Sequence, residues 1–141
     1  MVTSMRGLGA VPAAMVWCAG CAMATLFTAF HLRVKAIASL TQSGSPALWM
    51  SRHNAGCPIF ALTPEVGAQR KMALYRNVRT LYLEQSGDRD AVLHAACDLL
   101  VARGQVQNGD LIVVTIGEPM GKSGGTNTMK IVRVGEHRTT A

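Results

Sequence analysis

Short apolar segments alternate with helix-forming segments along most of the chain, and this alternation restricts the fold more than any other feature. The apolar segments predict strands at residues 34–41, 57–63, 78–84, 110–117 and 128–134. The segments between the first four predict helices at residues 45–53, 64–76 and 88–104. Strands that alternate with helices pair in parallel through right-handed crossovers, so helices are expected on both faces of one sheet.

The last two strand segments are joined by a glycine-rich stretch that partly matches a nucleotide-binding P-loop. Only three residues separate Gly117 from Gly121-Lys122-Ser123, one fewer than the P-loop pattern requires. The residues that follow alternate like a strand and do not open a helix, so this connection predicts an antiparallel hairpin. The predicted fold class is therefore α/β: a three-layer α/β/α sandwich of about five strands, mostly parallel, with an antiparallel last edge strand.

Residues typical of helix ends mark the predicted helices. Ser45 is the expected N-cap of the helix at 45–53, with Pro46 at its first helical position. Thr63 is the expected cap of the helix at 64–76, which again carries proline in its first turn. The segment 88–104 spaces its apolar residues at helical intervals and ends at Gly104, which makes it the clearest helix of the chain.

Length and charge narrow the possible partners. The 141 residues suffice for one domain with a single core. The net charge is +6, but the basic residues form no run or stripe and aromatic residues make up only 5%, which argues against a nucleic-acid partner and favours small anionic ligands. The four cysteines are too sparse for a disulfide scaffold, so a reducing, cytoplasmic location is expected.

The beginning of the chain permits more than one interpretation. Residues 7–30 contain no charged residue and follow Arg6, a pattern that suits a membrane span or a secretory signal. The segment is rich in Ala, Gly and Thr, which insert weakly, and Pro12 interrupts it. We therefore expect a mostly buried helix after Pro12 and no membrane partner, with a signal or anchor and a disordered leader as the alternatives.

Two stretches carry several motifs in a defined order. The first, KAIASLTQSGSPALWMSRHNAGCPIFALTP, has a Thr-x-Ser-Gly loop, a Ser-Arg helix end and a strand that ends in Ala-Leu-Thr-Pro. The second, GDLIVVTIGEPMGKSGGTNTMKIVRVGE, contains a Ser-Gly-x-Thr-Asn turn. Together they resemble the C-terminal domain of pyruvate kinase, and the resemblance covers roughly residues 24–136.

The resemblance implies an effector-binding and assembly domain without the catalytic barrel, which transfers phosphoryl from phosphoenolpyruvate to ADP. It divides the chain into a divergent apolar segment (1–21), the domain (22–136) and a tail (137–141). It assigns the magnesium and potassium ions of the complete enzyme to the barrel, so no cofactor is expected in this chain. It also implies a homo-oligomer, because this domain supplies one of the twofold interfaces of the pyruvate kinase tetramer.

Two loops are the candidate phosphate-binding sites. The first joins a strand to a helix, where free amides, hydroxyls and the positive helix end favour an anion; its residues are Thr41, Gln42, Ser43, Gly44 and Ser45. The second is the hairpin tip, with one mobile cation; its residues are Lys122, Ser123, Gly124, Gly125 and Thr126. The resemblance implies that the first loop holds the phosphate of a sugar-phosphate effector, and that the second faces it. An ordinary helix cap and a solvated hairpin tip are the alternatives.

No pattern in the sequence predicts a catalytic residue or a metal site. Cys18 and Cys21 have the two-residue spacing of zinc and redox motifs, but a second pair and a preceding strand are both missing, so a structural role is expected. His31, His94 and His137 show no spacing with acidic residues that suggests acid–base catalysis.

Three functions are therefore considered. The first is an effector-binding and oligomerising domain of the pyruvate kinase type that is inactive alone. The second is part of a working pyruvate kinase whose barrel lies on another chain. The third is an exported or lipid-anchored protein that binds a phosphorylated ligand, because CAGC at residues 18–21 resembles a lipoprotein cleavage site.

Overall fold

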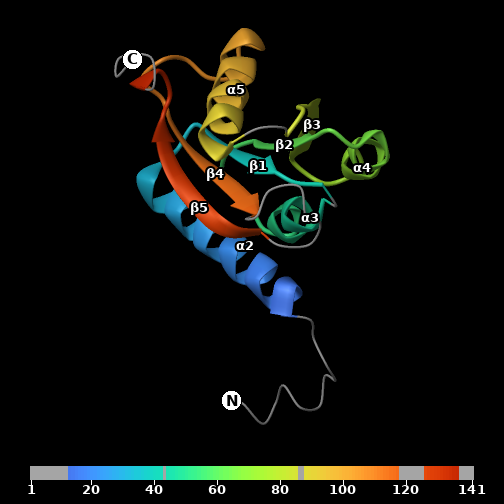
Figure 1. Cartoon of the computed structure of the whole chain (residues 1–141). Helices are drawn as coiled ribbons and strands as arrows, with labels where there is room; N and C mark the ends of the chain where they lie inside the picture. The colour runs from blue at the N-terminus through green and yellow to red at the C-terminus, as the bar shows by residue number, and fades with distance from the viewer. Residues whose placement is uncertain (1–12, 43, 86–87, 118–125, 137–141) are drawn as a thin grey trace, which may run out of the picture.

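The computed structural model describes residues 13–42, 44–85, 88–117 and 126–136 (Figure 1). The helices are α2 (Ala13–Leu32), α3 (Ser45–Ser51), α4 (Val66–Met72) and α5 (Arg89–Ala102). The strands are β1 (Ala36–Leu40), β2 (Ile59–Thr63), β3 (Val78–Tyr82), β4 (Leu111–Gly117) and β5 (Thr126–Arg133). They form one sheet in the order β3-β2-β1-β4-β5. β1 to β4 run parallel and β5 pairs antiparallel with β4, which confirms the predicted α/β sheet with its antiparallel edge strand.

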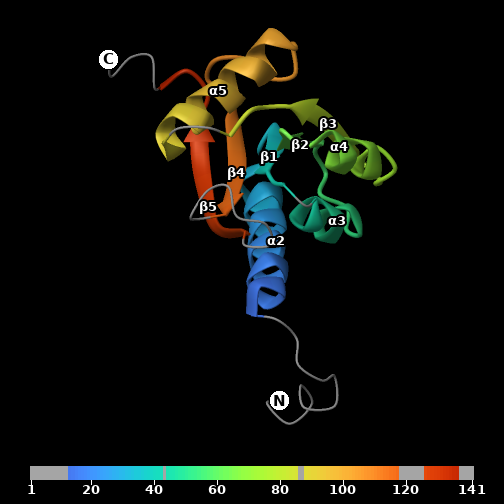
Figure 2. The ribbon, with the colours of Figure 1, turned by 45° about the vertical axis from the view of Figure 1, so that its right-hand side comes forward.

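Helices pack on both faces of this sheet, as the two views in Figures 1 and 2 show. Successive side chains of a strand point to opposite faces. Phe60 and Val114 belong to the apolar cluster that contains Leu100 of α5. Ile37 belongs to the other cluster, together with Met50 of α3. β1 and β2 are buried along their whole length, which explains why their sequences are nearly continuous apolar segments without alternation.

Helix α2 buries only one side of its described part, so the prediction of a mostly buried helix is wrong there. Ala22, Leu26 and Ala29 are buried against the sheet and α3. Phe27 and Phe30 are 66% and 68% exposed on the opposite side, where the ring of His31 on the same helix is their neighbour. Among the described residues, no helix has the length and apolar character needed to cross a membrane.

The caps of α3 and α4 lie at positions other than those predicted, although α3 begins at Ser45, the first residue of its predicted range. Gly44, not Ser45, is the N-cap of α3, because the chain turns at Gly44 and its carbonyl accepts the first helical hydrogen bond, from Leu48 N at 3.0 Å. Thr63 does not cap α4: its hydroxyl accepts a hydrogen bond from Glu65 N at 3.1 Å, and Glu65 occupies the cap position. The helix therefore starts after this local turn and stops at Met72, well short of residue 76.

Helix α5 matches its prediction closely. Asp88 is the N-cap, and its carboxylate accepts a hydrogen bond from Ala91 N at 2.9 Å. The helix ends at Ala102, and Gly104 follows with φ of 70°, the left-handed conformation that commonly closes helices.

Candidate functional site

The carboxyl ends of the parallel strands bring the loops after β1, β2 and β3 to one edge of the sheet. This edge is where open α/β sheets usually bind ligands. The first candidate loop follows β1 at this edge. β4 ends at Gly117 and β5 begins at Thr126 at the same edge, because β4 runs parallel to β1 and the two residues pair in the ladder.

Thr41 shapes the first loop from within. The residue is buried, with 5% of its surface exposed. Its backbone amide donates to Leu62 O at 3.1 Å, and its hydroxyl oxygen accepts a hydrogen bond from Gly44 N at 2.9 Å. The Thr41 side chain thus stabilises the turn, whereas the sequence pattern placed it among the residues that contact a phosphate.

Gly44 is held in a conformation and a space that both require glycine. Its φ is 87°, in the left-handed region that side chains disfavour. A Cβ at this position would lie 2.9 Å from Cγ and 3.0 Å from Sδ of Met72, which is itself fully buried. The shape of the loop is therefore fixed from both sides, by Thr41 and by Met72.

Gln85 also supports this edge, and sequence reasoning missed it. Its side-chain amide donates to the backbone oxygen of Leu62 at 3.0 Å and to that of Thr41 at 3.3 Å. It thereby joins the ends of β1 and β2 from the chain that follows β3. A lone glutamine in a polar loop gives no sequence signal for such a contact, since both acceptors are backbone atoms far along the chain.

The remaining candidate residues are only partly covered by the structure. Gln42 lies in the bend after β1 and is half-buried, Ser45 begins α3, and Thr126 begins β5. Ser43, Lys122, Ser123, Gly124 and Gly125 lie outside the described residues. The predicted convergence of the two loops on one ligand therefore stays a prediction.

Two further observations concern ligand and metal binding: the position of Arg52 and the distribution of possible metal ligands among the described residues. Arg52, at the end of α3, places its guanidinium over the ring of Trp49, 5.1 Å from the centroid, so it serves as a packing partner of its own helix. Within the described ranges, no three His, Cys, Asp or Glu side chains come together as a metal site would require.

Comparison with known proteins gives consistent matches. The family model "Pyruvate kinase, alpha/beta domain" matches residues 20–132. The chain is 38% identical over 114 residues to a pyruvate kinase of Buchnera aphidicola subsp. Baizongia pistaciae, covering 80% of this chain and 24% of that protein. It is 39% identical to pyruvate kinase II of Salmonella typhimurium, with the same coverage. It is 41% identical to a pyruvate kinase of Staphylococcus epidermidis, covering 77% of this chain and 19% of that protein. The chain thus spans only a fifth to a quarter of the length of these curated relatives.

Proposed function

Since the chain belongs to the pyruvate kinase α/β domain family, we propose that it binds a phosphorylated sugar effector and mediates assembly with a second copy of itself. The observation that carries this proposal is the continuous family match over residues 20–132, which contains both candidate loops. Phosphoryl transfer from phosphoenolpyruvate to ADP is proposed only for a complete enzyme of which this domain is part.

The geometry of the first loop supports the effector part of the proposal. Thr41, Gly44 and Gln85 fix the described backbone on both sides of residue 43 by hydrogen bonds and packing, and a backbone fixed in advance loses less conformational entropy on binding. In the proposed complex the backbone amides and hydroxyls of Ser43 and Ser45 and the amide of Gln42 donate to a phosphate, while the Gly44 amide keeps its bond to Thr41. Lys122 contributes a cation from the hairpin.

The surface of α2 supports the assembly part. Met23, Phe27 and Phe30 are all more than half exposed and are spaced along one side of the helix. β5 packs beside α2 and lies at the edge of the sheet, where Ile131 is 47% exposed. An apolar helix side next to an open strand edge favours burial against a partner, and a second copy offers the same surface.

Calorimetry tests the effector part. We expect saturable binding of glucose 6-phosphate or fructose 1,6-bisphosphate, and none of unphosphorylated glucose. Ser45→Asp should abolish binding, because it places a like charge at the phosphate contact. Lys122→Ala should weaken binding by about 1 kcal/mol or somewhat more, the scale of one charge-assisted hydrogen bond. Lys35→Ala is the matched control and should leave binding unchanged, because Lys35 is exposed and precedes β1 at the opposite edge of the sheet.

The opposite results are equally informative. No heat from either sugar phosphate, or binding that Ser45→Asp leaves intact, would show that the first loop is only a helix cap. The role of the domain would then be assembly alone.

The family match also fits a second candidate function, in which this domain is part of a working pyruvate kinase whose barrel lies on another chain. Affinity purification of the tagged chain from its source cells tests it. Co-purification of pyruvate kinase activity would support this candidate, and purification without that activity would contradict it.

A further inference from the structure

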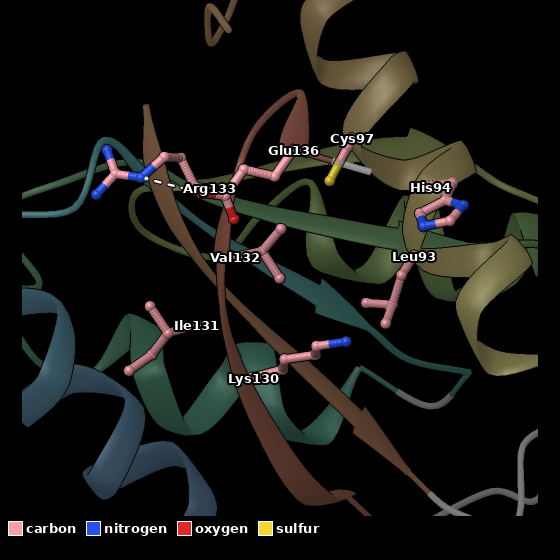
Figure 3. Close-up of a pocket in the computed structure, with 8 residues that line it drawn as sticks. All are labelled: Leu93, His94, Cys97, Lys130, Ile131, Val132, Arg133 and Glu136. Atoms are coloured by element: carbon pink, nitrogen blue, oxygen red, sulfur yellow. Dashed lines mark ion pairs between the residues drawn. The ribbon is translucent and has the colours of Figure 1, made fainter. Parts of the chain in front are cut away.

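A cleft of about 280 Å³ lies between α5 and β5, on the face of the sheet that α5 covers (Figure 3). Its α5 wall consists of Leu93, His94 and Cys97, and its β5 wall of residues 130–133, with Glu136 beyond the end of the strand. The cleft is therefore built from regular secondary structure, which fixes the positions of its lining side chains.

The cleft lies apart from the candidate phosphate loops. Lys130 pairs across the ladder with Val114, in the middle of the hairpin, whereas those loops follow the ends of the strands. A ligand in the cleft would contact the flank of α5 and the face of β5. It is a separate site from the one proposed above.

The two basic side chains of the cleft differ in their ion pairs with the described residues. Arg133 is engaged, since its Nη1 donates to Gly109 O at 3.0 Å and its Nε lies 3.6 Å from Oε1 of Glu136. Lys130 has no ion pair with any residue that the structure describes. Its ammonium extends toward Leu93 and His94, whereas Arg133 extends away from α5 (Figure 3).

Two side chains of the cleft form an apolar part of its wall. Leu93 is buried, and Val132 packs against the same core. Burial raises the pKa of the Cys97 thiol, the nearby charge of Asp98 raises it further, and Lys130 opposes them. The thiol therefore stays protonated at neutral pH and does not compete as an anion for the ammonium.

We propose that this cleft binds a small monocarboxylate with a short apolar chain. The carboxylate accepts hydrogen bonds from the Lys130 ammonium, and the apolar chain lies between Leu93 and Val132. One available cation suits one negative charge, and a cleft of about 280 Å³ limits the ligand to a small molecule.

Nuclear magnetic resonance of the full chain tests this proposal, with butanoate as the probe at constant ionic strength. The backbone amides of residues 93–97 and 130–133 should shift saturably with butanoate. 1-Butanol, which lacks the charge, and inorganic phosphate, which lacks the apolar chain, should not shift them.

Two variants separate the charge from the apolar wall. Lys130→Gln should lower the association constant for butanoate about tenfold, the effect of losing one charge-assisted hydrogen bond. Lys71→Gln is the control and should leave the constant unchanged. Val132→Thr replaces one methyl group by a hydroxyl at nearly the same side-chain volume, and should remove the preference for butanoate over acetate. Thermal unfolding of each variant verifies that the fold is intact.

Three results would overturn the assignment: no saturable shift with butanoate, equal binding by Lys130→Gln, or saturable phosphate binding that depends on Lys130. The last result would mean that the cleft binds anions in general and that its apolar wall contributes nothing to binding. Neither loop variant of the sugar-phosphate experiment touches this cleft, so the two proposals can fail independently.

Discussion

Gly44 and Met72 are in direct contact, at a distance that leaves no room for a side chain at position 44. A Cβ there would approach Cγ of Met72 to 2.9 Å. The contact joins the loop after β1 to the last turn of α4, so the conformation of the candidate phosphate loop depends on the packing of a different helix.

Gly44→Ala should therefore destabilise the fold by roughly 2–4 kcal/mol, from left-handed backbone strain and overpacking against Met72. Gly56→Ala is the matched control, because Gly56 has φ of 72° but no atom within 4 Å of an added Cβ. It should cost only about 1–2 kcal/mol. Urea unfolding measures both, and equal losses would show that the Met72 contact is unimportant.

Gln85→Ala removes two hydrogen bonds to the ends of β1 and β2. We expect the free energy of unfolding to fall by about 1–2 kcal/mol, at roughly 1 kcal/mol for each bond. Gln105→Ala serves for comparison, because the hydrogen bonds of Gln105 are exposed. If the two variants lose the same stability, the joining role assigned to Gln85 is wrong.

Thr115 donates a hydrogen bond to the hydroxyl of Ser39 at 3.1 Å, and both residues are fully buried between β4 and β1. Thr115→Val should destabilise the protein by about 1–3 kcal/mol, because it leaves the Ser39 hydroxyl without this donor. The double variant with Ser39→Ala should lose less than the sum of the single variants. Additive losses in a thermal double-mutant cycle would contradict this coupling.

Light scattering at tens of micromolar, roughly where weak symmetric interfaces saturate, tests assembly. We expect a homodimer, and replacement of Phe27 and Phe30 by glutamine should shift it toward monomer, because large apolar side chains dominate interface energies. Leu74→Gln is the control: Leu74 is 88% exposed but follows α4, away from α2. A wild-type chain that is monomeric at this concentration would count against the proposal.

The purified chain should form no pyruvate from phosphoenolpyruvate and ADP with magnesium and potassium present. The family match covers the α/β domain, whereas phosphoryl transfer needs a site that positions both phosphates with their metal ions. A coupled assay for pyruvate provides the measurement. Turnover above that of a mock preparation would refute the prediction.

The order and type of the elements followed from local sequence. The apolar segments in β1 and β2, the helical spacing and closing Gly104 of α5, and the strand-like residues after Gly121-Lys122-Ser123 were sufficient to predict the α/β fold and its antiparallel hairpin. These signals work because strand and helix periodicities and caps depend on residues within a few positions of each other.

The errors arose where local side-chain bonds compete with the helix. The Thr63 hydroxyl accepts a hydrogen bond from Glu65 N and delays the start of α4, whereas the left-handed turn at Gly44 places the cap of α3 one residue earlier than predicted. The side of α2 that carries Phe27 and Phe30 also could not be assigned from sequence, because apolar residues occur all around that helix.

The sequence by itself determined the fold class, the strand succession and the family motifs. Only the tertiary structure decided that Met72 confines Gly44, that Gln85 joins two strand ends, and that Lys130 faces α5 across a cleft. The physical reason is distance along the chain. The Gln85 bonds span 23 and 44 positions, and their strength depends on how the backbone ends meet in space, which no local pattern encodes.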